Sequence, residues 1–482
     1  MPDRRSLLTR TDVYKFGHRH QYPPGTTHVG SYLESRGTAG PGLEDVVFFG
    51  LTYYLREYLG ESAAVTAADV DRFAEVSEAI LRTPPDVSHL RELAALGRVP
   101  LRIRTLPEGT VAAPRVPLMT VENTVPGFGW LVNYVETLLM KVWCPITVAT
   151  NGLRFRRLFE RLTAETCDNA GHVPFQMHDF GYRGVSSEET AAIASAAHLA
   201  NFLGTDTTAG ALALADAYNG GDLAGVAASV PASEHSVMCS WGESADDFDA
   251  LANMLDVYPT GVVSVVADTY DLWRFVDEYA GRRLKDRILA RDGRFVVRPD
   301  SGDPETILCG DPDAADPRAR AGVVRLLDDR FGSAENAKGY RVLNPKVGVI
   351  QGDGVTYDRV ASILSRLKAM GYASSNVLFG SGGALLQKWN RDTLKMAIKA
   401  SWCVVNGVER EISKDPVTDP GKRSKVGRLR VDFEAGRWQT TERATAEQAA
   451  GGMLRTVYED GRLVDPPTMA DVRRLLADAA RP

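Results

Sequence analysis

The stretch RFVVRPDSGDP, residues 294–304, places a short apolar run directly before a polar tip. The same order recurs along the middle of the chain, with amphipathic segments such as 186–202 and 242–255 in between. The other examples are PFQMHDFGYRG (174–184), FLGTDTTAG (202–210), GVAASVPASEHS (225–236), GVVSVVADTYD (261–271), KVGVIQGDGV (346–355) and NVLFGSGGALL (376–386). Strands that alternate with helices indicate a parallel sheet, and seven such units favour a closed barrel over an open sheet.

A closed parallel barrel brings the loops after its strands to one face, and ligands bind at that face. The tips quoted above carry aspartate, arginine, histidine and glycine, so we expect these residues to meet there. In the segment 186–202, Ser186 and Glu189 have the spacing of a capping box, which predicts the start of a helix. The expected fold class is therefore α/β, with a barrel over residues 151–395.

The two ends of the chain have a different pattern. Residues 1–150 mix strand patterns, such as LRIRTLPEGTVAA, with two apolar helical patterns. Residues 396–482 contain two hairpin candidates, RLRVDFEAGRWQTT and MLRTVYEDGRLVD, the second with Asp460-Gly461 at its turn. We expect 1–150 and 396–482 to form one β-rich domain beside the barrel.

The composition is that of a soluble globular protein of two or three structural units, with 482 residues, 44% hydrophobic and 24% charged. The N-terminus has no signal-peptide core and no run of about 18 apolar residues occurs, so we expect a cytoplasmic protein without a membrane partner. The net charge of −6 argues against nucleic acid as a partner. Five scattered cysteines favour reduced thiols: Cys144, Cys167, Cys239, Cys309 and Cys403.

Two of the tips have the chemistry of a phosphate and sugar site. In RPDSGDP, the guanidinium of Arg298 suits phosphate or an aromatic ring, and the carboxylate of Asp300 suits ribose hydroxyls or hydrated Mg²⁺. A salt bridge that closes the loop is the structural alternative. In FGSGGALLQK, Gly380, Gly382 and Gly383 would let backbone amides approach an anion at a helix start, and the alternative is a tight turn.

The remaining tips each have an ordinary structural explanation as well. Asp206 suits a helix N-cap, a phenylalanine such as Phe180 suits the core, and Asp353 suits a plain turn. Taken together, several carboxylates, two arginines, a glycine-rich loop and an aromatic side chain indicate a site for a phosphorylated sugar and a flat ring. The tip residues concerned are Phe180, Arg183, Asp206, Ser264, Asp268, Gly352 and Asp353, whereas Asp271 is placed to cap the next helix.

His235 stands alone in PASEHS, residues 231–236. No His or Cys lies at a suitable spacing, which argues against a metal ligand. By itself a single histidine is more often structural than chemical, and packing, a general base or a phosphate carrier all stay open on the residues alone.

Eight stretches, in order and over nearly the whole chain, resemble the nicotinamide phosphoribosyltransferase family. They are TDVYKFGHRHQYPPGT (11–26), HDFGYRGVSS (178–187), GTDTTAG (204–210), PASEHS (231–236), RPDSG (298–302), VIQGDGV (349–355), FGSGGALLQK (379–388) and KDPVTDPGKRSKVGRL (414–429). The resemblance implies the type II phosphoribosyltransferase fold, an irregular α/β barrel with a β-rich second domain from both chain ends. It also implies a homodimer with shared active sites and the synthesis of nicotinamide mononucleotide from nicotinamide and phosphoribosyl pyrophosphate, in NAD salvage.

The resemblance further implies roles for single residues around the pyridine ring. Phe180 would stack on one face of the ring, and Tyr14 of the partner subunit would cover the other. Asp206 would accept a hydrogen bond from the carboxamide NH₂ and so repel the carboxylate of nicotinate. ATP is implied as a coupled co-substrate, with His235 as the residue that takes its phosphate, and Mg²⁺ as a cofactor carried by pyrophosphate and water rather than by a protein metal site.

The phosphate and ribose positions follow in the same way. Asp300 and Asp353 would face the ribose, and across the dimer interface Arg36, Arg391 and Lys399 would hold phosphate. His235, Arg298 and Asp300 would be the catalytic groups. The other positions implied to contact the substrates are Arg183, Ser264, Asp268, Gly352, Gly382 and Gly383.

Three positions depart from the family pattern: Val13 and Ala384 replace a serine and a glycine, and Ala397 stands where a phosphate-binding serine is expected. The competing functions are nicotinate phosphoribosyltransferase, against which Asp206 argues, and a non-catalytic binding or signalling protein. The presence of His235, Arg298 and Asp300 argues against the second.

Overall fold

The computed structural model describes residues 6–37, 43–60, 63–242, 246–415, 418 and 423–481. The chain divides into two compact units. Unit 1 comprises Met1–Thr150, Ala213–Gly221 and Trp389–Ala479, and unit 2 comprises Asn151–Leu212, Asp222–Lys388 and Ala480–Pro482. The expected domains of 1–150 with 396–482 and of 151–395 differ from this division chiefly at Ala213–Gly221 and at residues 389–395, which both belong to unit 1.

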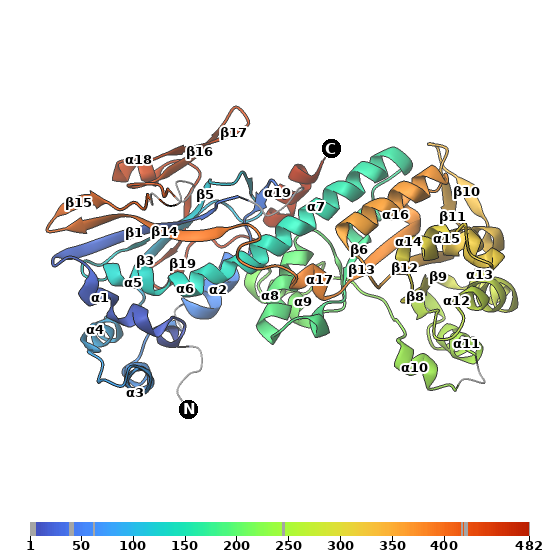
Figure 1. The fold of residues 1–482 in the computed structure, drawn as a ribbon, viewed down its shortest axis with the longest axis horizontal. Helices are drawn as coiled ribbons and strands as arrows, with labels where there is room; N and C mark the ends of the chain where they lie inside the picture. The colour runs from blue at the N-terminus through green and yellow to red at the C-terminus, as the bar shows by residue number, and fades with distance from the viewer. Residues whose placement is uncertain are drawn as a thin grey trace. The chain divides into compact units, whose positions relative to one another are not determined.

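Unit 2 contains a six-stranded sheet in the order β7-β6-β13-β12-β9-β8 (Figure 1). Every neighbouring pair in it is parallel. The strands are β6 (Met177–Asp179), β7 (Gly204–Thr205), β8 (Thr260–Val266), β9 (Asp292–Arg298), β12 (Val347–Gln351) and β13 (Val377–Ser381). These are six of the seven strands predicted from the apolar runs, which confirms the parallel α/β class.

The seventh run, residues 225–236, is not a regular strand, and the prediction was wrong at this point. It instead makes one isolated parallel bridge to each edge of the sheet, Ala228 to Gly204 and Ala232 to Ser264. Pro231, which lies between the two bridges, has no amide hydrogen for a continuous ladder. The two bridges nevertheless join β7 to β8 and complete a ring of strands.

The helices of unit 2 follow the strands as the alternating pattern predicts. α16 (Tyr357–Ala369) buries Val360, Ile363, Leu364 and Leu367, which share one helical face. Asp271 caps α12 (Leu272–Arg274) by accepting a hydrogen bond from the Arg274 amide. Other helices with residues in unit 2 are α7 (Trp143–Thr166), α8 (Glu188–Leu199), α9 (Thr208–Tyr218), α10 (His235–Cys239), α11 (Phe248–Val257), α13 (Lys285–Ala290), α14 (Pro304–Cys309), α15 (Pro317–Phe331), α17 (Gly383–Leu386) and a π-helix (Phe275–Arg283).

The start of α8 differs from the predicted capping box. Ser187, one residue after Ser186, is the N-cap, and its hydroxyl accepts a hydrogen bond from the Thr190 amide. The Ser186 amide instead donates to Gln387 Oε1, so Ser186 makes a tertiary contact and the predicted box with Glu189 does not form.

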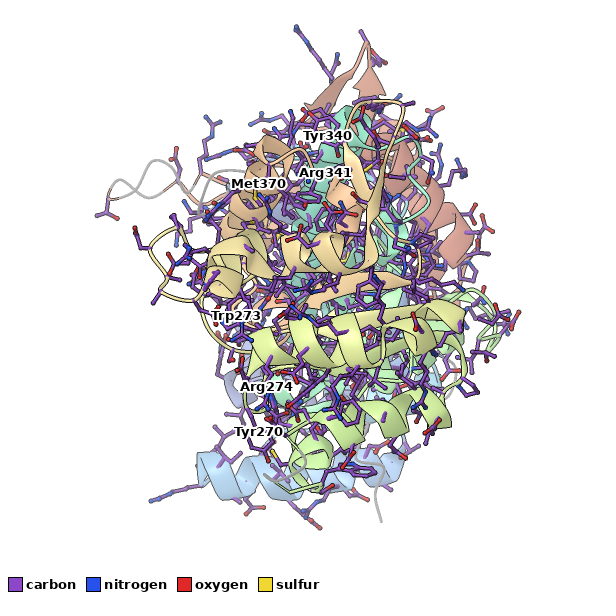
Figure 2. The ribbon with its side chains drawn as sticks, turned by 90° about the vertical axis from the view of Figure 1, so that its right-hand side faces the viewer. Tyr270, Trp273, Arg274, Tyr340, Arg341 and Met370 are labelled. Carbon is purple, nitrogen blue, oxygen red and sulfur yellow. The ribbon has the colours of Figure 1, made fainter. Side chains whose placement is uncertain are left out.

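A set of contacts around Arg341, which Figure 2 labels together with Met370, ties the α15 and α16 region together. The Arg341 guanidinium donates to the Met370 carbonyl at 2.7 Å and lies 3.1 Å from Asp328 Oδ2. It also lies over the Tyr372 ring, 4.0 Å from its centroid, and the Tyr372 hydroxyl donates to the same Asp328 oxygen at 2.7 Å. One carboxylate therefore serves two donors that stack on each other.

Unit 1 contains a seven-stranded sheet in the order β15-β14-β1-β5-β3-β18-β19, in which three strands from the N-terminal part of the chain lie between two pairs from the C-terminal part (Figure 1). The confirmed β-rich region thus combines the two flanks of the sequence. α5 (Gly129–Tyr134) packs on β1 and β5. The strands are β1 (Thr26–Ser35), β3 (Leu101–Thr105), β5 (Pro117–Asn123), β14 (Met396–Val405), β15 (Val408–Glu411), β18 (Arg455–Glu459) and β19 (Arg462–Leu463).

Both predicted hairpins are present. The first joins β16 (Arg430–Glu434) to β17 (Arg437–Thr441). The second joins β18 to β19 through Asp460 and Gly461, whose φ values of 50° and 92° are those of the expected turn.

A buried carboxylate explains why Ala213–Gly221 belongs to unit 1. Glu108 accepts hydrogen bonds from the Gly50 amide at 2.7 Å and from the Thr52 amide and hydroxyl at 2.7 and 2.8 Å. The Tyr218 hydroxyl is the fourth donor at 2.7 Å, and the Tyr218 ring stacks on Phe49 at 5.1 Å. Burial raises the pKa of Glu108, and these four donors oppose that shift.

We predict that Glu108→Gln lowers the free energy of unfolding by about 3 kcal/mol, because an amide NH₂ would face donors in a buried site. Urea denaturation followed by circular dichroism measures the change. Tyr218→Phe removes one donor only and should cost about 1 kcal/mol. A Gln variant as stable as the unsubstituted protein would contradict this account of the site.

Candidate active site

The carboxyl ends of β8 and β9 and the start of α10 bring three predicted site residues into contact. His235 is the first residue of α10, and its Nε2 lies 3.1 Å from Asp268 Oδ1. Its Nδ1 lies 3.8 Å from Asp300 Oδ2. The imidazole is 42% exposed whereas the Asp268 side chain is only 4% exposed. A buried carboxylate therefore holds the ring, and part of the ring stays accessible to solvent.

Asp268 is the centre of this cluster. Besides His235, its carboxylate accepts hydrogen bonds from the Asp300 amide at 2.8 Å and from the Ser301 hydroxyl at 2.5 Å. One buried carboxylate thereby fixes both the imidazole and the loop after β9 that carries Asp300. Ser264 is buried in β8, and its backbone bonds to Pro231 and Ser233 hold the segment before His235 against the barrel.

Arg298, at the end of β9, supplies the positive charge of the cluster. Its Nη2 donates to the Ser233 carbonyl at 3.2 Å and lies 4.0 Å from Asp300 Oδ2. Its buried Nε has no hydrogen-bond partner among the described residues. A buried donor of this kind is satisfied most readily by an anionic ligand oxygen.

The electrostatics of Asp300 reflect a crowded acidic site. Burial is the largest effect on its pKa and raises it, and the nearby carboxylates of Asp268 and Asp353 act in the same direction. Arg298 and His235 oppose the shift. Bound cationic charge would relieve the repulsion among these acids, which lie where the sequence predicts a ribose and pyrophosphate site.

Gly352 joins the acidic cluster to an aromatic side chain. A Cβ built at this glycine would lie 2.8 Å from Asp300 Oδ1 and 3.7 Å from both Arg298 Cδ and Phe180 Cε2. The close approach explains why glycine stands here. The Phe180 ring also covers Gly380, where a Cβ would lie 1.9 Å from Phe180 Cε2.

Asp206 follows β7 and is exposed, and it is not the N-cap of α9, which begins at Thr208. The Ser229 hydroxyl donates to its Oδ1, and its amide donates to the Asp179 carbonyl at 2.9 Å. The carboxylate is therefore oriented by the irregular segment that completes the barrel, rather than by the helix that follows it.

The glycine-rich loop packs against the loop after β6. A Cβ at Gly383 would lie 2.6 Å from the Gly184 carbonyl oxygen, and one at Gly184 would lie 2.7 Å from the Gly383 amide nitrogen. Gly382 has open space, with Phe180 O at 3.7 Å from its built Cβ. Arg183 and Asp353 are both exposed at the same strand ends.

The remaining predicted site residues lie in unit 1. Tyr14 is 61% exposed, and Arg391 pairs with Asp392 at 3.3 Å. Burial lowers the pKa of Lys399, and repulsion by Arg36, Lys414 and Arg391 lowers it further, while Glu136 raises it. Neighbouring cations that repel one another are a favourable setting for an anion.

Sequence reasoning missed several polar residues that organise the site. Ser301 and Ser229 lie inside stretches already singled out, but a serine in a loop gives no specific signal of its partner. The Ser233 hydroxyl accepts the Val266 amide at 3.0 Å, which ties the segment before His235 to β8. Asp179 and Thr205 are also part of the site's framework.

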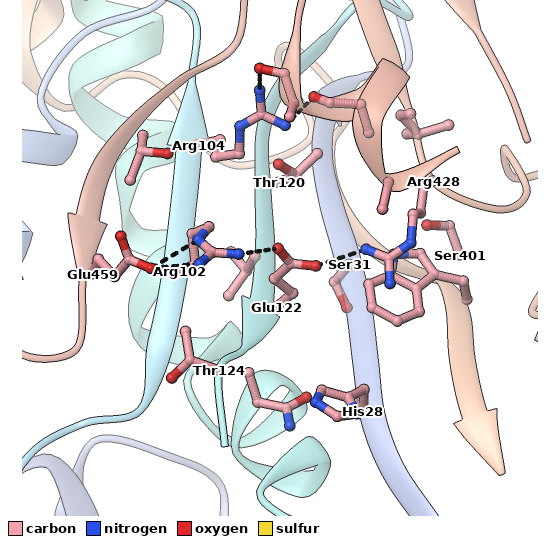
Figure 3. Close-up of a pocket in the computed structure, with 18 residues that line it drawn as sticks. His28, Ser31, Arg102, Arg104, Thr120, Glu122, Thr124, Ser401, Arg428 and Glu459 are labelled. Atoms are coloured by element: carbon pink, nitrogen blue, oxygen red, sulfur yellow. Dashed lines mark hydrogen bonds and ion pairs between the residues drawn. The ribbon is translucent and has the colours of Figure 1, made fainter. Parts of the chain in front are cut away.

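A separate cavity of about 560 Å³ lies in unit 1 (Figure 3). Glu122 bonds to Arg102 at 3.2 Å and to Arg428 at 2.9 Å, and Arg428 lies 3.5 Å from the Trp402 ring centroid. Glu459 neutralises the other side of Arg102 at 2.5 Å. The charges of Arg102 and Arg428 are thus offset by Glu122 and Glu459, in contrast to the buried Nε of Arg298 in the barrel site.

Two negative findings hold for the part of the chain that the structure describes. No group of three or more His, Cys, Asp or Glu side chains there is arranged to hold a metal ion. No described helix is both long enough and apolar enough to cross a membrane.

Solved structures define the class of fold. A nicotinate-nucleotide pyrophosphorylase from Pyrococcus furiosus matches 100% of this chain and 97% of its own at a TM-score of 0.61 and 16% identity. Human nicotinic acid phosphoribosyltransferase matches 97% of this chain and 93% of its own at a TM-score of 0.54 and 18% identity. The fold is therefore that of the type II phosphoribosyltransferases.

Sequence comparison gives the family. The nicotinate phosphoribosyltransferase family model matches residues 175–462, and the nicotinamide phosphoribosyltransferase N-terminal domain model matches residues 6–83. The nicotinamide phosphoribosyltransferases of Xanthomonas campestris and Acinetobacter baylyi are 42% and 39% identical, each over 99% of this chain and 99% and 98% of their own. The chain belongs to the nicotinamide phosphoribosyltransferase branch of this family.

Proposed function

We propose that the protein transfers the phosphoribosyl group of phosphoribosyl pyrophosphate to nicotinamide, giving nicotinamide mononucleotide and pyrophosphate. The observation that carries the proposal is the position of Gly352, because a Cβ built on it would lie within 4 Å of the Phe180 ring, Arg298 and Asp300 alike. A pyridine ring on Phe180 would thus lie beside groups suited to ribose and pyrophosphate. The reaction belongs to NAD salvage, and we propose the cytoplasm as its compartment.

The chemistry needs no general base, because the pyridine nitrogen already carries a free lone pair. The barrier lies in developing positive charge at the ribosyl carbon and in the departure of pyrophosphate. Asp300 and Asp353 would stabilise the first, and Arg298 would stabilise the second. Gly352 and the glycine-rich loop would let the sugar phosphate approach the backbone closely, and Arg183 would contact phosphate from the exposed side.

Mg²⁺ fits the acidic side of the site, since Asp268 and Asp353 raise the pKa of Asp300 and a cation would offset their repulsion. We propose that pyrophosphate and water would supply most ligands of Mg²⁺, with Asp300 and Asp353 as the nearby protein carboxylates. When bound, it would neutralise charge on the leaving group.

Asp206 supports nicotinamide over nicotinate as the substrate. Its carboxylate would accept a hydrogen bond from the carboxamide, and it would repel a substrate carboxylate at the same place. Ser229 fixes the orientation that this selection requires.

We predict that the unsubstituted protein forms mononucleotide from nicotinamide at least tenfold more efficiently than from nicotinate. Asp206→Asn should lower kcat/KM for nicotinamide about tenfold or more and relax the rejection of nicotinate, because the charge is lost. Chromatographic assay of product from phosphoribosyl pyrophosphate with each base measures both. Preference of the unsubstituted protein for nicotinate would overturn the proposed function, whereas unchanged values in the variant would remove only Asp206 from the site.

We also propose that His235 accepts the γ-phosphate of ATP and that this phosphoenzyme favours product formation. Donation of the Nε2 hydrogen to Asp268 leaves the lone pair on Nδ1, which is the nitrogen free to attack. The 42% exposure of the ring supports access by a nucleotide.

We predict that His235→Ala abolishes ATP hydrolysis and the stimulation of transfer by ATP but keeps basal transferase activity, because attack by pyridine needs no base. Incubation with γ-labelled ATP should give an acid-labile, alkali-stable label on the unsubstituted protein only. Label on the alanine variant would place the phosphate acceptor elsewhere.

We propose a homodimer with shared active sites, in which Tyr14, Arg36, Arg391 and Lys399 serve the partner's barrel. The mutual repulsion of the cations near Lys399 supports a phosphate ligand for this group. Tyr14, at 61% exposure, has an open ring face for a pyridine.

We predict that inactive Arg36→Ala and Arg298→Ala chains regain activity when they are unfolded, mixed and refolded together. A heterodimer of the two would contain one intact site, so the mixture should approach a quarter of the activity of the unsubstituted protein. Each variant refolded alone is the control. Heterodimers that form and stay inactive would count against shared sites.

A further inference from the structure

Asp179 is a completely buried carboxylate at the end of β6, directly before Phe180. Its Oδ1 accepts a hydrogen bond from the Gly181 amide at 2.7 Å, and its Oδ2 accepts one from the Thr205 hydroxyl at 2.9 Å. A buried carboxylate is costly unless such donors satisfy it, so this side chain is present for a specific reason.

The Thr205 hydroxyl also has its hydrogen-bonding positions occupied. It donates to Asp179, accepts the Thr207 amide at 2.9 Å, and lies 3.3 Å from the Ser195 hydroxyl. These contacts fix the direction of its hydrogen. The bond from Thr205 to Asp179 is therefore the side-chain link between the end of β7 and the end of β6.

The two linked residues each precede a residue of the base site. Phe180 follows Asp179, and Asp206 follows Thr205. Backbone hydrogen bonds also hold these residues in place. The Asp206 amide donates to the Asp179 carbonyl, and the Phe180 amide donates to the Ser381 carbonyl, both at 2.9 Å. The aromatic ring and the carboxylate are thus positioned through one buried pair.

We propose that Asp179 and Thr205 form a positioning pair that sets the place of Phe180 relative to Asp206 and thereby the selection of an aromatic amide over the corresponding acid. This inference rests on the proposed function of the site. Neither residue touches the base; each acts through its chain neighbour. Displacement of a binding group by about 1 Å is enough to reduce activity by about 10²-fold, which is why such support has functional consequences.

The closing experiment compares Thr205→Val with Thr205→Ser. Valine keeps the volume of threonine and removes the hydroxyl, so Asp179 Oδ2 loses its donor, whereas serine keeps the hydroxyl. We expect Thr205→Val to raise KM for nicotinamide about tenfold and to lower the nicotinamide-to-nicotinate preference. KM for phosphoribosyl pyrophosphate should change less than twofold, and Thr205→Ser should restore values close to those of the unsubstituted protein.

Thr163→Val is the matched control, because it also removes a buried hydroxyl from unit 2, one that lies 3.1 Å from His172 Nε2. It should lower Tm without changing KM for nicotinamide. A Thr205→Val protein with reduced Tm but unchanged KM and selectivity would show a merely structural role and overturn the inference. If Thr205→Val does not fold, Asp179→Asn, which keeps one acceptor for Gly181, is measured against the same criteria.

Different results would refute the proposed function and the positioning pair of Asp179 and Thr205. No product from nicotinamide with the unsubstituted protein would refute the proposed function itself. Normal turnover by the unsubstituted protein, together with unchanged base selectivity in Thr205→Val or Asp179→Asn, would refute the positioning pair alone.

Discussion

The site depends on the closure of the ring of parallel strands by the irregular segment 225–236. Its bridges from Ala228 to Gly204 and from Ala232 to Ser264 tie the two edge strands together. Because the segment is irregular, Ser229 reaches Asp206 on one side while His235 reaches Asp268 on the other. A regular strand would alternate its side chains between two faces and spread them along its length. The proline that disrupts the strand is thus compatible with the placement of both groups.

The acidic half of the site is organised by hydrogen bonding more than by ion pairing. Asp268 holds His235, the Asp300 amide and Ser301 at once, and it is nearly inaccessible to solvent. Arg298 stays 4.0 Å from Asp300, beyond hydrogen-bond distance, and keeps a buried donor without a described partner. The positive charge of Arg298 is therefore available to a ligand, because no carboxylate among the described residues forms a hydrogen-bonded ion pair with it. The ion pairs around Glu122 in unit 1 show the opposite condition, in which the arginines are already satisfied.

The base half of the site has a different physical basis. Asp179 and Thr205 are buried and fix the backbone, while Phe180 is partly exposed and Asp206 is exposed. His178, behind Phe180, is kept neutral at ordinary pH because burial lowers its pKa to about 4. The His178 imidazole is therefore not a cation beside the Asp206 carboxylate. Selection of an amide would follow from one exposed negative charge held in place by neutral donors.

The sequence by itself determined the six regular strands, the Asp271 cap and the Asp460-Gly461 turn, because these follow from local periodicity and local backbone preference. Its motifs also gave the family and the identity of the residues at the strand ends. Only the tertiary structure decided that Ser229 orients Asp206, that Ser187 rather than Ser186 caps α8, and that Tyr218 joins unit 1 through Glu108. Each of these depends on a hydrogen bond that acts over about 3 Å between residues distant in the chain, or on competition from such a bond, and no local pattern records where such a partner will lie.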